Sequence, residues 1–142
     1  EDLQPWAFLK PTPSSAIAAM ELYASLVTLY LMLRQMPRSD SVEYFVPLCT
    51  DNQGNAYSIL KHAAKKWPNS ALLMELFLQA AEFGTHLMAS HVHREFNTWA
   101  DDLVNQQLQD FDQSKRLDWL ERDAQWVVLP YLMVLGEPSS EA

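Results

Sequence analysis

The chain has 142 residues, of which 49% are hydrophobic and 20% charged, a composition typical of one soluble globular domain with its own core. Its formal net charge of −8 argues against a protein that binds nucleic acid by charge alone, because such proteins are basic. The acidity is compatible with a metal-dependent nuclease, since that kind of site needs clustered carboxylates. Cys49 is the single cysteine, which excludes an intrachain disulfide and a zinc site built from cysteines, and an intracellular location is expected.

The first strong signal along the chain is a long apolar helix, predicted over residues 16–36. Ser14 and Ser15 precede it and are candidate N-caps, and Pro37 ends it. Ahead of this helix, residues 6–9 have the composition of a short strand.

Residues 16–33 are nearly as long and apolar as a membrane-spanning helix. Glu21 lies within them, and a charge at the centre of a span costs about 2.5–3.5 kcal/mol on insertion scales. A core helix of a globular domain has the same apolar length. We therefore interpret the segment as a buried helix and expect no membrane partner.

Strands and helices alternate after Pro37. A β-branched and aromatic run over residues 42–50 predicts a buried strand, which ends at a polar turn. The later segments predict, in order, a helix over 56–66, a helix over 71–83 ended by Gly84, a strand over 87–92 and a helix over 97–109. This alternation indicates an α/β fold with parallel strand pairing.

The C-terminal part is aromatic and harder to assign. Residues 117–135 fit a helix or a strand, and the pattern leaves both open. We interpret Trp119, Trp126 and Tyr131 as packing residues rather than as a binding site. Residues 136–142 are expected to form a disordered tail.

Three carboxylates stand where this architecture would expose them. Asp51 directly follows the first predicted strand, and ligands gather beyond the carboxyl ends of strands in α/β sheets. Glu21 lies on an apolar helix, where a charge is costly without a partner, and Asp101 lies near the start of a later helix. Each also has an ordinary interpretation: Asp51 as a helix cap, Glu21 as a solvated charge near a helix start, and Asp101 with Asp102 as a first-turn acidic pair.

The contexts of these carboxylates carry a resemblance when taken together and in order. They are Met-Glu-Leu-Tyr-Ala at 20–24, Cys-Thr-Asp-Asn-Gln at 49–53 and the block at 91–103. The last block has all five fixed positions of the pattern His-x5-Asn-x2-Ala-Asp-x-Leu that retroelement ribonucleases H carry. Over residues 16–110 the chain thus resembles the ribonuclease H domain of retroelement reverse transcriptases, including the gypsy and DIRS-like groups. The resemblance implies an α/β, ribonuclease H-like fold, a mixed sheet flanked by helices, in a single partial domain over residues 1–135.

The resemblance also implies a chemistry. The family uses four carboxylates around two Mg²⁺ ions to hydrolyse the RNA strand of RNA–DNA hybrids, the metals stabilising the attacking and leaving oxygens. By position, Glu21, Asp51 and Asp101 would be three of these four metal ligands and catalytic residues. Asp102 points about 100° away around the helix and is not expected to take part.

Other site residues follow from the same comparison. His91 matches the mobile catalytic histidine that the family uses near the leaving group or in product release, although an ordinary strand-end histidine would look the same. Gln53 occupies the place where the family touches the minor groove of the hybrid, and we expect it to bind substrate together with Asn52.

Lys61, Lys65 and Lys66 form the one dense basic cluster, beside Trp67. Some family members bear a basic, tryptophan-containing protrusion there that grips the hybrid, so these lysines are expected to bind substrate; the alternative is a solvated helix face. The implied partners are an RNA–DNA hybrid and the other domains of a polyprotein.

The chain departs from the family at its first carboxylate. The family carries that residue on its first strand, in an Asp-Ala/Gly-Ser type motif well before the glutamate-bearing helix. We expect the first strands, two including this one, to be missing here, and residues 1–142 alone to be inactive and poorly soluble or molten. The alternatives are a degenerate, non-catalytic interaction module that keeps the fold, and an unrelated helical adaptor.

Overall fold

Helices and a small parallel sheet alternate along the part of the chain that the computed structural model describes, residues 13–135. The expected strand at 6–9 and the expected tail at 136–142 lie outside these residues. The elements run in the order α1 (Pro13–Gln35), β1 (Tyr44–Thr50), α2 (Gln53–Lys61), α3 (Asn69–Glu82), β2 (Thr85–His91), α4 (Thr98–Val104) and α5 (Leu129–Leu135), with single 3₁₀ turns at Arg94–Phe96, Gln113–Lys115 and Glu121–Asp123. The chain therefore has an α/β architecture.

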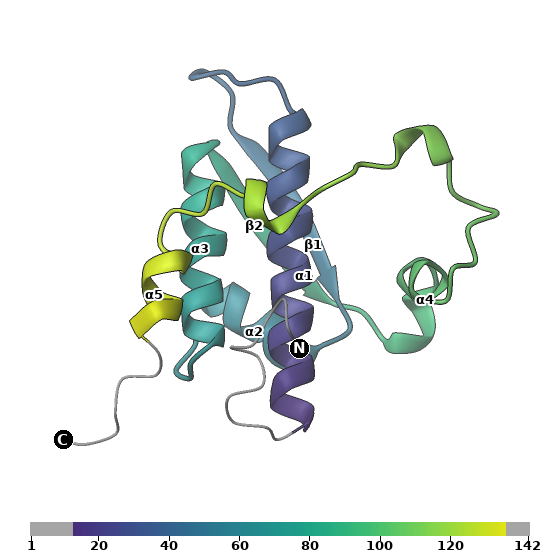
Figure 1. Ribbon diagram of the computed structural model, residues 1–142, viewed down its shortest axis with the longest axis horizontal. Helices are drawn as coiled ribbons and strands as arrows, with labels where there is room; N and C mark the ends of the chain where they lie inside the picture. Colours follow the sequence, from purple (N-terminus) through teal and green to yellow (C-terminus); the bar gives the residue numbers. More distant parts are fainter. Residues whose placement is uncertain (1–12, 136–142) are drawn as a thin grey trace.

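The sheet consists of β1 and β2 in parallel, with Tyr44 opposite Thr85 and Thr50 opposite His91. Parallel neighbours need a crossover connection, and α2 and α3 supply it. Figure 1 shows the two strands behind α1 and α3, which pack against each other. Both strands end on the same side, so the segments that follow Thr50 and His91 leave the sheet next to each other.

One edge of β1 has no partner strand within residues 13–135. The Tyr44 N–H donates to the carbonyl of Gly84 (3.1 Å), and the Thr50 carbonyl accepts from the N–H of Val92 (3.0 Å). Because strand residues alternate in direction, the even-numbered residues of β1 turn their backbone groups toward β2 and the odd-numbered ones toward the open edge. Pro47 is among the latter, a position that suits proline because no N–H is withdrawn from the ladder.

The core is built around α1. Its apolar side chains at spacings of three or four residues are almost completely buried, with exposures of 0–2% for Leu22, Leu26, Leu29 and Leu33. They meet Leu72 and Leu76 of α3, each 0% exposed, in one hydrophobic cluster. By length and composition alone, Ala16–Gln35 could cross a membrane, but here the helix buries one face within the protein.

Most of the predicted elements are confirmed. The apolar helix, the strand ending at Thr50 and the later strand appear as α1, β1 and β2. The expectation that the first strand is buried was wrong, because residues of β1 alternate between half-buried and exposed positions, with Phe45 63% exposed. Gly84 follows α3 with a φ of 58°, the left-handed conformation that a glycine tolerates after a helix end.

Several predicted boundaries are wrong for local reasons. Ser14 and Ser15 do not cap α1, because the helix already begins at Pro13, a residue that suits a first turn. The helix expected to reach residue 66 ends at Lys61, where His62 adopts a left-handed φ of 56° and its N–H bonds back to Ile59. The helix expected to reach residue 109 ends as α4 at Val104.

The C-terminal segment is neither one helix nor one strand. It runs through 3₁₀ turns, crosses α1 and reaches α5 beside α3 (Figure 1). Trp126 packs edge-on against Tyr30 of α1, with ring centroids 4.8 Å apart, and Trp119 joins it at 6.4 Å. The two tryptophans are therefore packing residues as predicted, whereas the prediction was wrong for Tyr131, which is 73% exposed.

A buried carboxylate fastens the start of α5. Glu75 of α3 is 0% exposed, and its Oε1 accepts the backbone N–H groups of Val127, Val128 and Leu129 at 2.5, 3.1 and 3.3 Å. These donors have no partner within α5, because the first N–H groups of a helix never do. A negative charge also suits that end of the helix dipole.

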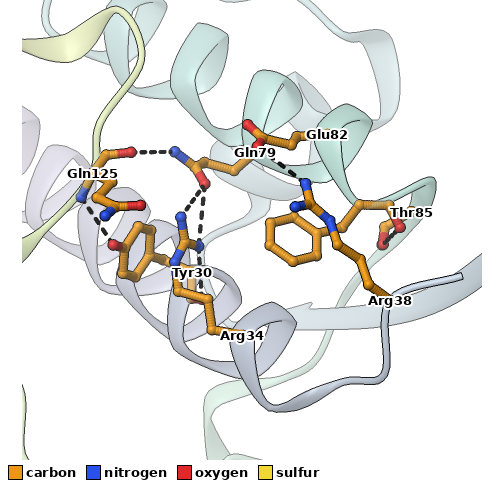
Figure 2. A network of polar contacts seen from close by, with 8 residues as sticks. Tyr30, Arg34, Arg38, Gln79, Glu82, Thr85 and Gln125 are labelled. Atoms are coloured by element: carbon orange, nitrogen blue, oxygen red, sulfur yellow. Dashed lines mark hydrogen bonds and ion pairs between the residues drawn. The ribbon is translucent and has the colours of Figure 1, made fainter.

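Gln79, one turn further along α3, connects the same segment to α1 (Figure 2). Its Oε1 accepts hydrogen bonds from both terminal nitrogens of Arg34, each at 3.3 Å, and its Nε2 donates to the carbonyl of Gln125 at 3.1 Å. The Gln125 N–H donates to the Tyr30 hydroxyl at 2.9 Å, and the Arg34 guanidinium lies 3.4 Å from the centre of the Tyr30 ring. The C-terminal segment is thus bound by side chains of both core helices.

Replacing Glu75 should detach this segment. Glu75→Ala leaves three backbone donors without an acceptor, so we expect the free energy of unfolding to fall by about 3 kcal/mol. Glu75→Gln is the matched control, because it keeps an acceptor oxygen and should lose only about 1 kcal/mol. Chemical denaturation measures both values, and amide hydrogen exchange at residues 127–129 should accelerate in the alanine variant. Wild-type stability in Glu75→Ala would show that the contact does not anchor α5.

Candidate functional site

The three carboxylates expected in the active site line one pocket of about 520 Å³. Glu21 comes from α1, Asp51 directly follows β1, and Asp101 comes from α4. The wall formed by β1 is a continuous run from Val46 to Thr50, and no residue of β2 lines the pocket. The pocket therefore lies beside the open edge of β1.

The floor of the pocket is apolar and its rim is charged. Leu29 and Met32 of α1 and Leu48 of β1 lie along the floor, and the carboxylates lie toward the end where β1 stops. Glu21 and Asp51 are half-buried, and Asp101 is exposed. Figure 1 shows α4 set apart from the helical layer, so Asp101 reaches the pocket from the least packed of the three elements.

Two asparagines tie the start of α2 to α1. Asn52 accepts the N–H of Asn55 at 3.0 Å, which makes it the N-cap of α2, and its Nδ2 donates to Oε2 of Glu21 at 2.8 Å. The buried Asn55 donates to the carbonyl of Ala18 at 3.0 Å. The bond from Asn52 joins the turn after Asp51 to the Glu21 side chain, whereas the bond from Asn55 joins α2 to the backbone of α1 without touching a carboxylate.

His91 lies beside Asp51 but does not line the pocket. It is the last residue of β2, and its Nε2 is 3.2 Å from the backbone carbonyl oxygen of Asp51. The ring is exposed and meets the ring of His93 edge-on at 5.4 Å. The parallel pairing explains this position, because it aligns Thr50 with His91 at the ends of the two strands.

Arg94 and Asn97 also line the pocket, and no role for Arg94 could be assigned from the sequence. The sequence indicated a place for Arg94 near the site only because this residue lies between His91 and Asn97, two fixed positions of the ribonuclease H pattern. No ion pair joins Arg94 to a carboxylate within residues 13–135. A cation at the mouth of an acidic pocket is suited to binding a phosphate.

The donor set fits Mg²⁺ in kind, because aspartate and glutamate oxygens are the hard ligands that this ion prefers. Within the described part of the chain, however, no group of three or more His, Cys, Asp or Glu side chains is arranged to hold a metal ion. Glu21, Asp51 and Asp101 thus share a pocket without forming a complete ligand set. A further carboxylate or a movement of α4 is needed to complete it.

Comparison with protein-family models, with curated proteins and with solved structures finds no match. The residues of the chain and their geometry are therefore the basis on which its function is inferred.

The expected substrate-binding residues lie along α2. Gln53 is the exposed first residue of the helix, next to the pocket, whereas Lys61 is its last, roughly 12 Å further along the axis at about 1.5 Å per residue. The Lys61 ammonium lies 4.4 Å from the centre of the Tyr57 ring. Lys65 and Lys66 are exposed in the connection that follows. The basic cluster thus lies at the opposite end of α2 from the carboxylates.

A second and larger pocket, of about 970 Å³, lies beside β2. It is lined by α3 and by β2, with Met74, Phe77 and Leu87 among its apolar residues. None of the residues expected in the active site lines it. This pocket is therefore separate from the one that the carboxylates line beside β1.

Proposed function

We propose that the chain is the larger part of a ribonuclease H-like domain that hydrolyses the RNA strand of RNA–DNA hybrids within a retroelement polyprotein. The observation that carries the proposal is the meeting of Glu21, Asp51 and Asp101 in one pocket, although they come from three separate elements. Completed by a further carboxylate, such a set would be suited to binding two Mg²⁺ ions, which would supply charge stabilisation for phosphodiester hydrolysis.

The order of the elements supports the same proposal. A glutamate-bearing helix precedes a strand that ends at an aspartate, and a parallel strand ending in a histidine precedes the helix with the last aspartate. The retroelement ribonuclease H pattern requires this succession. A retroelement ribonuclease H acts inside the cell, and the apolar face of α1 is occupied by the core and so is not offered to a membrane.

A second candidate is a non-catalytic interaction module with the same fold. The observation that favours it is that no complete metal-ligand group exists within residues 13–135. The two candidates differ in whether a fourth carboxylate joins the pocket. In the ribonuclease H family that carboxylate lies on a first strand, which pairs with the strand that here ends directly before Asp51.

The open edge of β1 is where such a strand would pair. Phe45, Pro47 and Cys49 turn their backbone groups outward there, and the pocket lies alongside. A strand in this position would cover the half-buried Met32 and Leu48 and bring its own carboxylate to the charged end of the pocket. Residues 1–142 alone are then expected to be inactive.

Extending the protein with an upstream strand that carries an Asp-Ala/Gly-Ser type motif should raise the free energy of unfolding and bring Mg²⁺-dependent cleavage of a hybrid. Each large apolar side chain that the strand covers contributes about 1.5–3 kcal/mol. The same extension with Asn in place of that Asp is the control, and it should be stabilised to the same extent without cleaving. Hybrid cleavage by residues 1–142 alone would contradict this arrangement.

Asp101 and its neighbour Asp102 offer a matched test of the metal site. Only Asp101 lines the pocket, so Asp101→Asn should weaken Mg²⁺ binding about tenfold, whereas Asp102→Asn, with the same change in charge, should leave it unaltered. Calorimetric titration with MgCl₂ measures both. Equal effects of the two substitutions would show that only the net charge matters, and the metal site would be rejected.

The basic cluster should contribute to hybrid binding in the extended domain. Replacing Lys61, Lys65 and Lys66 by Ala should reduce the slope of log affinity against log salt by about one for each phosphate that the variant no longer binds. The control replaces Lys115, Arg116 and Arg122, which changes the charge equally at exposed sites elsewhere. If both triple variants bind a hybrid with the same affinity and slope, the cluster is only a solvated surface.

A further inference from the structure

Asn52 has both ends of its side-chain amide in use. Its Oδ1 accepts the N–H of Asn55 at 3.0 Å, and its Nδ2 donates to Oε2 of Glu21 at 2.8 Å. A carboxylate only accepts and a backbone N–H only donates, so the orientation of the amide is determined by its two neighbours. Each amide atom keeps one further hydrogen-bonding position, so the two bonds fix the orientation of the amide and still leave room for the substrate contact expected from the sequence.

The hydrogen bond from Asn52 restricts the conformations of the Glu21 side chain. Its side chain has three rotatable bonds, and a hydrogen bond from a fixed donor reduces the conformations open to it. Within residues 13–135, neither Asp51 nor Asp101 has a side-chain hydrogen bond, and none reaches Oε1 of Glu21. Glu21 is thus the one carboxylate of the pocket that is positioned by a side chain, with one oxygen held and the other available.

We propose that Asn52 is a positioning residue, which holds Oε2 of Glu21 so that Oε1 can bind a divalent cation. This inference rests on the proposed function. Ligating carboxylates commonly accept such a hydrogen bond from a group that does not itself touch the metal. An amide suits the task because it donates without charge: a lysine would compete with the cation, and an aspartate would add a fourth negative charge and no donor.

The two asparagines allow a positioning role to be separated from a structural one. Asn52→Ser keeps an N-cap for α2, since serine is among the preferred caps, but is too short to reach Glu21. Asn55→Ser removes the bond to Ala18, which holds α1 against α2 without touching a carboxylate. Asn52→Ser should therefore retain the melting temperature and weaken Mg²⁺ binding about fivefold, the effect of one hydrogen bond. Asn55→Ser should lower the melting temperature and leave the Mg²⁺ affinity within about twofold of the wild type, a difference smaller than one hydrogen bond makes.

The experiment uses residues 1–142 and MgCl₂ alone, with calorimetry and thermal melts on the wild type and both variants. Weaker Mg²⁺ binding in both variants, in proportion to their loss of stability, would overturn the positioning role. In a Glu21→Gln background, Asn52→Ser should cause no further loss of Mg²⁺ affinity, and a second fivefold loss would also overturn it.

A measurement without metal separates this inference from the proposed function. In nitrogen-15 NMR spectra, Glu21→Ala should shift the side-chain NH₂ signals of Asn52 and leave those of Asn55 in place. If the wild type binds no Mg²⁺, the metal site of the proposed function is wrong, and the NMR shift alone decides whether Asn52 positions Glu21. Unchanged Asn52 signals in Glu21→Ala would overturn the inference whatever the Mg²⁺ result.

Discussion

The burial of Glu75 beneath the first turn of α5 is the contact on which the closure of the core depends. Two strands provide too little surface to cover a helix pair by themselves, and sheets of this size need other elements packed on them to be stable. In this chain the C-terminal segment supplies that cover by crossing α1 and ending beside α3. A buried carboxylate is costly unless its hydrogen bonds are satisfied, and here three backbone N–H groups satisfy it. The Glu75 carboxylate in turn supplies the acceptor that the first N–H groups of α5 need. The buried carboxylate and the start of the helix therefore satisfy each other.

The elements that carry the three carboxylates are supported unequally. α1 is held on one side by the C-terminal segment, through Tyr30, and on the other by the start of α2, through Asn55. Glu21 therefore stands on a helix that is fixed on both sides, while Asp51 stands on a turn fixed to that helix. Asp101 differs, because α4 exposes its own apolar residues, with Trp99 at 72%, and is not packed into the core. Asp101 is therefore the least firmly supported of the three carboxylates that line the pocket.

The elements that could be predicted from the sequence are those determined by local patterns. The apolar spacing of α1, the β-branched run of β1 and the glycine after α3 each act within a few residues. The path of residues 116–128 could not be predicted, because it depends on contacts such as Gln125 to Tyr30, which lie 95 positions apart. For the candidate site, the residue types and their order predicted three carboxylates, and all three line the pocket. The hydrogen bond from Asn52 to Glu21 joins residues 31 positions apart, and the sequence around neither residue predicts it.

Pro47 affects which strands can pair with the open edge of β1. A strand that pairs there finds one donor missing at the centre of the ladder, so each encounter is weaker than with an ordinary edge. For a strand on another molecule, at micromolar concentration, that deficit is a barrier to association and hence to aggregation. For a strand tethered to the same chain, the effective concentration is in the range of about a millimolar, which compensates for the lost bond. Pro47 thus favours pairing with a strand of the same chain over pairing with a strand of another molecule.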